Sequence, residues 1–291
     1  MPELPEVEAL RDFLQGAATR RVIDNIGIVA INALKTADPP IDAAVGATVT
    51  GASRWGKFLG LDMSTSGGAE PDLYLIIHFA RSGWLQWNEH VSDRPLRMST
   101  RNPLAARVTF TDGAGFTVTE HGSKKSLAIY LVRSPEDVPG IAELGPDALG
   151  ISREDFERAI NSNHQSKNLL TDQRRMAGIG NAYSDEILWE ARLSPAKLGS
   201  SLTDTERETL FNAVNTTLGD ATERVRTARP ATLKAEKRQG MNVHGRFGQA
   251  CPRCGDTIAQ VSFADSDYQY CPTCQTKGKR LSDRRMDRML K

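Results

Sequence analysis

The stretch CPRCGDTIAQVSFADSDYQYCPTC, residues 251–274, decides how the last part of this chain folds. It holds the four cysteines of the 291-residue sequence as two CxxC pairs, Cys251 with Cys254 and Cys271 with Cys274. Two such pairs around a hairpin-sized insert are typical of a tetrahedral thiolate cage for one structural zinc ion. The insert, with IAQVSF and YQY around a polar ADSD turn, predicts a β-hairpin. Two disulfides or an iron site of the rubredoxin type are the alternatives, and the small size of the module favours zinc.

The cysteine stretch lies in a basic quarter of the chain. Residues 223–291 carry 15 Lys and Arg against 7 Asp and Glu, a net charge of +8; the whole chain carries +1, so residues 1–222 carry −7. A basic surface suits a phosphate backbone, because bound cations displace its counterions. A zinc ribbon that binds protein, or a solvated basic tail, is the alternative. The cations near the cysteines are Arg246, Arg253, Lys277, Lys279, Arg280, Arg284 and Arg285.

Upstream of the basic quarter, residues 151–228 have a helical pattern. Ser152 and Thr203 each suit a helix N-cap, with an acidic residue three positions later. The helices are interrupted by MAGIGNAYSDE, residues 176–186, a glycine-rich turn that is as consistent with a tight helix–helix connection as with an anion site. Before them, RSPEDVPGIAELGPDALG, residues 133–150, is rich in proline and glycine and reads as a linker.

The first 133 residues predict one helix followed by strands. Apolar residues at helical spacing, with Pro5 in the first turn and Gly16 as a C-terminal cap, predict a helix over residues 5–15. Short segments rich in Val, Ile and Thr follow, separated by turn residues, which favours an antiparallel β-sandwich or flattened barrel. The fold class is therefore α+β with several domains. The strand segments are RVIDNIGIVAI, ATVTGAS, KFLGLDM, LYLIIHF, GWLQW, ARVTF, GFTVTE and LAIYLV.

Composition places the chain among ordinary globular proteins, with 39% hydrophobic and 25% charged residues. No segment approaches the ~20 apolar residues of a membrane span, and no basic and apolar leader opens the sequence. Cysteines arranged as metal ligands rather than as a disulfide framework fit a reducing compartment. We therefore expect a cytoplasmic, nucleoid-associated protein with no membrane partner.

Five stretches together resemble the motifs of the formamidopyrimidine-DNA glycosylase and endonuclease VIII family, in that family's order: MPELPEVE at the start, GKFL around Lys57, KNLLTDQRRMAGIGNAYSDE over residues 167–186, HGRFGQACPRCG and YCPTCQ. The resemblance implies an N-terminal helix with a two-layer β-sandwich, a helix-two-turns-helix domain and a C-terminal zinc hairpin. The implied domains are a catalytic sandwich at 1–133, a linker at 134–150, the helical DNA-binding domain at 151–228, and a basic region with a four-cysteine zinc finger at 229–291.

The same resemblance implies a monomeric DNA-repair enzyme that excises damaged bases from double-stranded DNA. It would then cleave the abasic site by β-elimination, with or without a δ step. Pro2 would be the nucleophile after removal of Met1, because an N-terminal secondary amine has a pKa near 8 and is partly unprotonated at neutral pH. Glu3 would be the acid, Glu6 would orient the amine, and Lys57 would contact phosphate and assist proton transfer. Read alone, both glutamates could only complement a helix dipole, and Lys57 could be a solvated strand residue.

The resemblance also assigns DNA-binding roles to Lys57, Lys167, Gly180 and Asn181, with Gly178 in the same turn. The sequence departs from the family's motifs at the positions that recognise the damaged base. Arg81, in HFARSG, stands where the family has a methionine, and Lys125 and Ser126 stand where it has an arginine and a phenylalanine, so Arg81 or Lys125 would fill the gap left by a flipped base. Ser266 replaces an arginine that grips phosphate. The basic segment ARPATLKAEKRQGMN, residues 228–242, replaces a glycine-rich loop.

Two rival functions stand beside the enzyme, and the departures favour the first of them. One is a relative that binds damaged or abasic DNA, with lyase activity but little or no base excision. The other is a zinc-containing module that binds protein. Pro2, Glu3, Glu6 and Lys57 together favour the enzyme, because a pure binding protein needs no N-terminal secondary amine.

Overall fold

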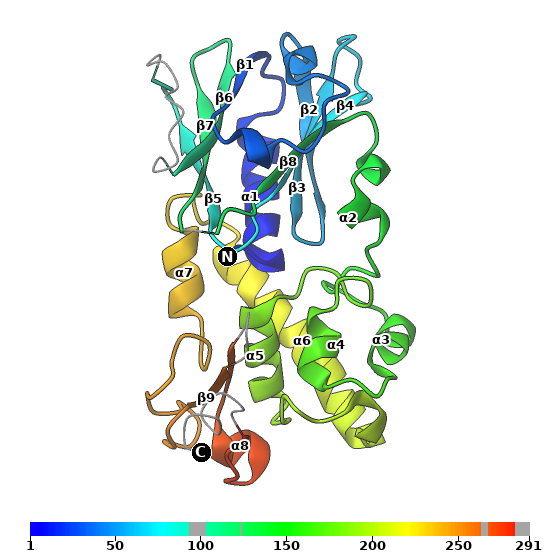
Figure 1. Ribbon diagram of the computed structural model, residues 1–291, viewed down its shortest axis with the longest axis vertical. Coiled ribbons are helices and arrows are strands. Elements are labelled where there is room, and N and C mark those ends of the chain that lie inside the picture. Colours follow the sequence, from blue (N-terminus) through cyan, green and yellow to red (C-terminus); the bar gives the residue numbers. More distant parts are fainter. Residues whose placement is uncertain (93–102, 123, 263–266, 283–291) are drawn as a thin grey trace. The chain divides into compact units, whose positions relative to one another are not determined.

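The computed structural model describes residues 1–92, 103–122, 124–262 and 267–282, which form two compact units (Figure 1). The first unit comprises Met1–Glu143 and Arg224–Lys234, and the second comprises Leu144–Glu223 and Ala235–Lys291. Within the described residues, none of the helices is long and apolar enough to cross a membrane. Ser266, Arg284 and Arg285 lie outside the described residues.

The first unit begins with the predicted helix, α1 (Leu4–Ala17). Its apolar side chains Val7, Leu10 and Leu14 are buried in the core, where they pack with β-strand residues. A helix of this length is marginal on its own, so this burial stabilises it. The predicted cap at Gly16 is wrong: the helix continues to Ala17, and the Ala18 N–H donates to the Leu14 carbonyl at 2.8 Å. Ala18 is fully buried, so packing of the last turn overrides the cap signal of Gly16.

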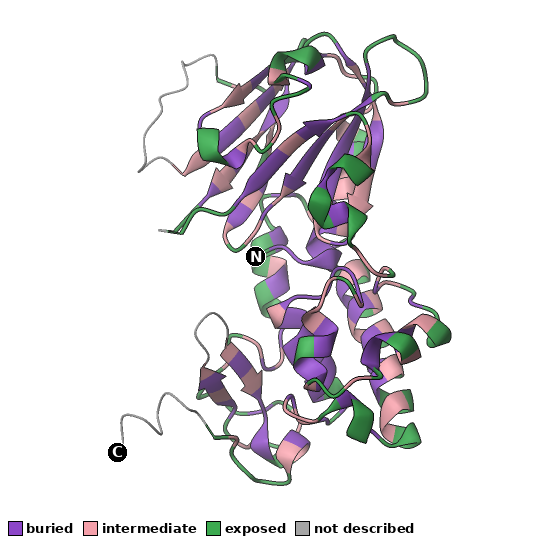
Figure 2. Cartoon of the chain, turned by 45° about the vertical axis from the view of Figure 1, so that its right-hand side comes forward, coloured by how far each residue is buried: buried purple, intermediate pink, exposed green. Residues whose placement is uncertain are grey.

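Within the described residues of this unit, eight strands build the two predicted layers. One sheet has the order β1-β6-β7-β5 and the other β2-β3-β4-β8, and the neighbouring strands are antiparallel. The inward faces of both sheets and one side of α1 form a single apolar core, drawn in purple in Figure 2. The strands are β1 (Ile23–Ile28), β2 (Thr48–Trp55), β3 (Phe58–Ser64), β4 (Leu73–His78), β5 (Gly83–Asn88), β6 (Leu104–Phe110), β7 (Gly115–Glu120) and β8 (Ala128–Val132).

The segment read as a linker packs on the outer face of the second sheet. It forms two short turns of helix, η3 (Pro135–Asp137) and α2 (Pro139–Ala142). Val138 and Ile141 form a small apolar cluster with the outward side chains of β4 and β8. Gly140 lies so close to Phe58 that an added Cβ would approach its ring to 2.7 Å. This half of the segment is therefore part of the first unit rather than a free connection.

The second unit contains the helices and the zinc hairpin. Ser152 caps its first helix, accepting from the Asp155 N–H at 3.1 Å as its sequence pattern predicts. Two turns over residues 172–180 join α4 to α5. The hairpin strands β9 and β10 pair in antiparallel register over the predicted insert. The end of α6 and the start of α7 belong to the first unit, and the rest of both helices belongs to the second. The elements are α3 (Arg153–Ile160), α4 (Ser166–Thr171), α5 (Asn181–Glu190), α6 (Asp204–Val225), α7 (Leu233–Gln239), β9 (Ala259–Ser262), β10 (Asp267–Tyr270) and α8 (Pro272–Thr276).

Candidate functional site

The start of α1 places two buried carboxyl groups beside Pro2. Pro2 is itself buried, and Glu3, which follows it, is the N-cap residue of α1. The Glu3 N–H donates to Oε2 of Glu6 at 2.8 Å, and neither glutamate is more than 1% exposed. This bond fixes the backbone directly after Pro2. Once Met1 is removed, a secondary amine would lie next to two carboxyl groups, an arrangement suited to nucleophilic attack with acid assistance.

Lys57 lies in the two-residue turn between β2 and β3. Its neighbour Gly56 has φ +53°, a left-handed conformation that glycine adopts without strain, and Trp55 pairs with Phe58 across the turn. His78, at the end of β4, pairs with Phe58, and the two rings are 4.6 Å apart. Burial, with a smaller contribution from the charge of Lys57, lowers the pKa of His78 from 6.5 to about 4. A neutral imidazole therefore lies near the Lys57 ammonium at pH 7.

The ion pair between Arg54 and Glu8 connects the Lys57 turn to α1. Arg54, near the end of β2, donates through Nε to the Glu8 carboxylate on α1 and through Nη1 to the Gly56 carbonyl at 3.0 Å. Burial alone would raise the pKa of Glu8, but hydrogen bonds and charges from Arg54 and Arg11 lower it overall. Arg54 thus connects the helix that carries Pro2 and Glu3 to the residue that precedes Lys57.

The two loops expected to fill a gap in DNA lie side by side in the first unit. Arg81 is exposed in the turn between β4 and β5, and the His121 N–H at the end of β7 reaches the Ser82 carbonyl at 3.4 Å. Glu120, which is 3% exposed, accepts from the N–H groups of Ser126 and Leu127 at 2.7 and 2.9 Å. The Lys125 ammonium donates to the Glu120 carbonyl. The buried carboxylate therefore anchors the loop that presents Lys125.

Lys167 is not at the surface, where a contact with phosphate would require it. Its side chain is 1% exposed, and its ammonium is paired with the Asp185 carboxylate. The ammonium also donates to the Ser184 hydroxyl at 3.0 Å and to the Asn181 carbonyl at 3.1 Å. Through these contacts Lys167 holds the first turn of α5, and a phosphate contact would have to compete with a buried ion pair.

The turn before α5 is held by side chains within the second unit. Gln173 accepts from the Gly178 N–H at 3.0 Å and donates to the Ile179 carbonyl at 2.8 Å. Gly178 has φ +106°, so a side chain at this position would strain the turn. The Asn181 amide donates to the Asp267 carbonyl of β10 at 2.9 Å. Asn181 therefore links the turn to the zinc hairpin, while Gly180 provides the N-cap of α5.

Two buried acids of α5, Asp185 and Glu186, organise the segment before the cysteines. Glu186 accepts from the N–H groups of Asn242, Val243 and His244 at 2.8–2.9 Å. Its burial nevertheless raises its pKa. His244 Nδ1 lies 2.8 Å from Asp185 Oδ2. The sequence pattern indicates no role for His78, Gln173 or these acids, because their partners are distant in the chain, although Gln173 and both acids lie in a stretch that carries the family resemblance.

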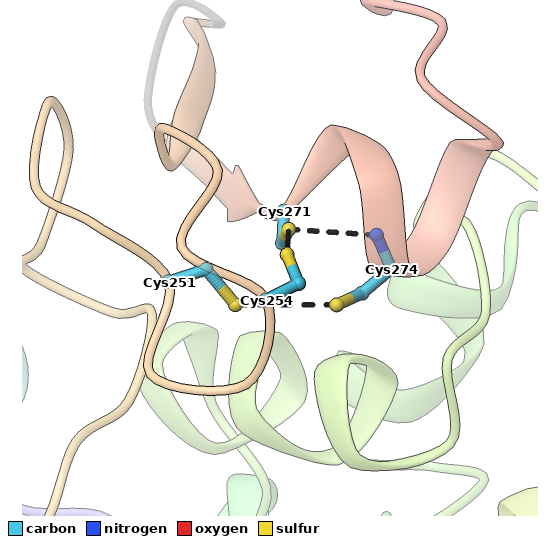
Figure 3. A group of neighbouring side chains, drawn as sticks. All are labelled: Cys251, Cys254, Cys271 and Cys274. Atoms are coloured by element: carbon cyan, nitrogen blue, oxygen red, sulfur yellow. Dashed lines mark hydrogen bonds between the residues drawn. The ribbon is translucent and has the colours of Figure 1, made fainter.

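The four cysteines have the geometry of a zinc cage (Figure 3). Their sulfur atoms all lie within 4.8 Å of one another, with 3.4 Å between Cys254 and Cys271 and 4.0 Å between Cys251 and Cys274. Zn–S bonds of about 2.3 Å in a tetrahedron require sulfurs about 3.8 Å apart. The donor set fits one structural zinc ion and leaves no ligand position for substrate, so these cysteines hold the metal and perform no catalysis.

The expected site residues divide between the two units. Pro2, Glu3, Glu6, Lys57, Arg81 and Lys125 belong to the first, and Lys167, Gly180, Asn181 and the four cysteines to the second. Within the first unit, Arg54 links the Pro2 helix to the Lys57 turn. Within the second, α5 links the glycine turn to the zinc hairpin.

Three family models match the chain. The formamidopyrimidine-DNA glycosylase N-terminal domain matches residues 1–119, the H2TH domain of the same glycosylase matches residues 144–230, and a zinc finger found in FPG and IleRS matches residues 248–277. Together they account for both units and for the cysteine module.

Individual relatives agree with the family models. A formamidopyrimidine-DNA glycosylase of Enterococcus faecalis is 30% identical over 294 residues, covering 97% of this chain and 100% of the relative. An uncharacterized formamidopyrimidine-DNA glycosylase-like protein of Mycobacterium tuberculosis is 50% identical over 149 residues, covering 51% of this chain and 94% of that protein. A solved complex of the LlFpg protein with THF-DNA and an inhibitor has 25% identity and a TM-score of 0.80, covering 94% of this chain and 100% of that one. The Lactococcus lactis Fpg bound to DNA with an abasic site has the same fold, at 24% identity and a TM-score of 0.79.

Proposed function

Because the chain belongs to the formamidopyrimidine-DNA glycosylase family, we propose that it is a DNA-repair glycosylase that excises a damaged base and cleaves the strand at the abasic site. Its partner would be double-stranded DNA, in the nucleoid of the cytoplasm, with one protein chain acting alone. The observation that carries the proposal is the start of α1, where Pro2 directly precedes the buried Glu3 and Glu6. A helix start of this kind has no structural need for a second proline before its cap.

The reaction begins at Pro2. After Met1 is removed, the Pro2 nitrogen attacks C1′ of the damaged nucleotide, and the bond from C1′ to the base breaks. The departing base takes up one proton, which balances the proton that the Pro2 nitrogen loses on attack, and Glu3 protonates the sugar oxygen as the bond from C1′ to that oxygen breaks. The product is an iminium ion between Pro2 and C1′. Glu6 is already bonded to the Glu3 backbone, so it holds the amine in place rather than transferring the proton.

Strand cleavage follows from the iminium ion. Its positive charge acidifies the C2′ hydrogen, and when that proton leaves, the bond from C3′ to oxygen breaks and the 3′ phosphate departs. Water then hydrolyses the iminium and frees Pro2. Lys57 is the proposed phosphate contact and proton carrier, with the neutral His78 beside it. The zinc ion supplies structure to the hairpin and takes no part in these steps.

The proposal is tested by trapping the iminium. We expect protein whose first residue is confirmed as Pro2 to form a borohydride-stable crosslink with abasic-site DNA. The matched control is a chain with extra residues before Pro2, which should form no crosslink because its Pro2 nitrogen is an amide. This control is cleaner than Pro2→Gly, since a new N-terminal glycine would itself be an amine. A failure of authentic Pro2 protein to crosslink would remove Pro2 as the nucleophile.

A relative with lyase activity but little base excision is the second candidate. Arg81 and Lys125, which lie on adjacent loops, favour it because neither supplies the aromatic stacking surface expected at this point. A panel of duplexes with oxidised, ring-opened and abasic nucleotides separates the two candidates. Release of any damaged base supports the glycosylase, whereas cleavage of only the abasic duplex supports the second candidate.

A further inference from the structure

One face of α5 contacts the zinc hairpin at three successive turns of the helix. Asn181, Asp185 and Trp189 are spaced four residues apart, so they lie on the same side of the helix. Asn181 donates to the Asp267 carbonyl at 2.9 Å, and Asp185 Oδ1 accepts from the Gln269 N–H at 3.2 Å. At the third turn, the Trp189 indole N–H donates to the Cys251 sulfur at 3.4 Å. This last contact connects the helix to a zinc ligand directly.

Trp189 is held tightly in this position. It is 8% exposed and packs with Val243, Ile258 and the two buried cysteines. The Arg253 guanidinium, from within the first CxxC pair, lies 3.8 Å above the centre of the indole ring. Arg253 also donates to the Trp189 carbonyl and to the Glu190 carboxylate, both at 2.7 Å. Contacts from α5 and from the CxxC turn therefore fix the orientation of the indole ring.

The electrostatics of the cage explain why such a donor matters. Four thiolates around one divalent zinc ion leave a net negative charge, and buried charge is costly unless hydrogen bonds or opposite charges offset it. Cys251 is 2% exposed, so water offers little compensation. Its sulfur accepts from the backbone N–H groups of Arg253 and Cys254, and Trp189 adds a third donor. Arg253 contributes the positive charge.

We propose that Trp189 is a positioning residue for the zinc site, whose indole N–H stabilises the metal-bound Cys251 thiolate and couples the cage to α5. Such donors beyond the ligands themselves commonly change metal affinity by about 10–100-fold. The proposed effect depends on the indole N–H group. A phenylalanine at this position would keep an aromatic ring for Arg253 and the apolar cluster but would lose the bond to sulfur.

The test uses the full chain with cobalt in place of zinc. A hydrogen bond to a thiolate stabilises the sulfur lone pairs, so its loss lowers the energy of the sulfur-to-cobalt charge-transfer bands. We expect Trp189→Phe to shift these bands to longer wavelength and to release zinc to a chelator about tenfold faster. Trp87→Phe is the matched control: Trp87 donates to Glu89 in the first unit and should change neither measurement.

Identical spectra and identical release rates for Trp189→Phe and the unaltered chain would overturn the proposal. If Trp189→Phe fails to fold by circular dichroism, 3-benzothienylalanine at position 189 replaces it, since this analogue keeps the two fused rings and lacks only the N–H. The same band shift is expected from the analogue. Neither measurement involves DNA, so the outcome is independent of the proposed repair activity.

Discussion

At the scale of single residues, the lowered pKa of His78 leads to a prediction about the stability of the chain in acid. Its pKa is about 4 in the folded chain against about 6.5 unfolded, so between these values the unfolded chain binds more protons. The contribution of His78 to the free energy of unfolding should therefore be complete above pH 6.5, fall by up to about 3 kcal/mol toward pH 4, and change no further below that. His78→Asn, which cannot titrate, should show a shallower decline when urea unfolding is measured across this range. Equal slopes for the two proteins would contradict a neutral His78 in the folded chain at pH 5–6.

Lys167 shows at the same scale which contacts of a residue a sequence motif indicates and which it does not. The motif places Lys167 close to Asn181, and the structure agrees. Sequence spacing carries no information about burial, however, and cannot show that Asp185, eighteen positions later, takes the ammonium. Whether a lysine ammonium binds a phosphate or a carboxylate depends on the fold around it.

Removing the Lys167 charge distinguishes these two roles. Lys167→Met leaves the buried Asp185 without its ammonium partner, while the contacts to His244 and to the Gln269 N–H stay, so we expect a loss of about 3 kcal/mol of stability, measured by urea unfolding. Adding Asp185→Asn should restore part of the loss, because no unpaired charge then remains buried. A phosphate contact predicts a different result: unchanged stability, and a slope of log K against log salt that is shallower by about one.

At the scale of elements, the strands follow from the sequence and the packing of the connections does not. The eight strand segments each alternate or cluster apolar residues, and burial on the sandwich core preserves that pattern. The segment over residues 133–150 has prolines and glycines that read as a linker. It packs because Val138 and Ile141 meet apolar side chains on the outer face of a sheet, a face that only the assembled strands create.

At the same scale, a prediction follows from Arg54, which connects α1 to the turn after β2. Arg54→Lys keeps a cation for Glu8 but cannot reach Glu8 and the Gly56 carbonyl together, since a lysine lacks the forked guanidinium. We expect cleavage of abasic DNA to slow by up to about 100-fold as the Lys57 turn moves, with little change in DNA affinity. Arg11→Lys is the control: Arg11 pairs with Glu8 and Asp12, both on its own helix. Equal rates for the two variants would show that Arg54 only stabilises the helix.

At the scale of the whole molecule, the sequence predicts the order of the sandwich, the helical region and the zinc hairpin along the chain. It does not predict which residues belong to which compact unit. The cysteine spacing alone indicates the zinc hairpin, and the glycine turn falls between two helices as expected. Residues 224–234 belong with the first unit although they follow the long helix α6, because Val225 and Leu233 are buried in the sandwich core. Such a return of the chain depends on contacts between distant segments, which local sequence patterns do not encode.

Zinc removal gives the prediction for the molecule as a whole. Among the described residues of the hairpin, Ala259, Val261 and Tyr270 form a small apolar cluster, so the metal should supply most of its folding free energy. After chelation of zinc from the full chain, we expect protease cleavage to begin between residues 248 and 277, while α1 and the strands of the sandwich, whose side chains form the large core, stay protected. Peptide mapping by mass spectrometry locates the cleavages, and added zinc should restore protection. Cys254→Ser, with one ligand replaced, should be cleaved there without a chelator, because a hairpin that depends on the metal cannot keep its fold with an incomplete cage.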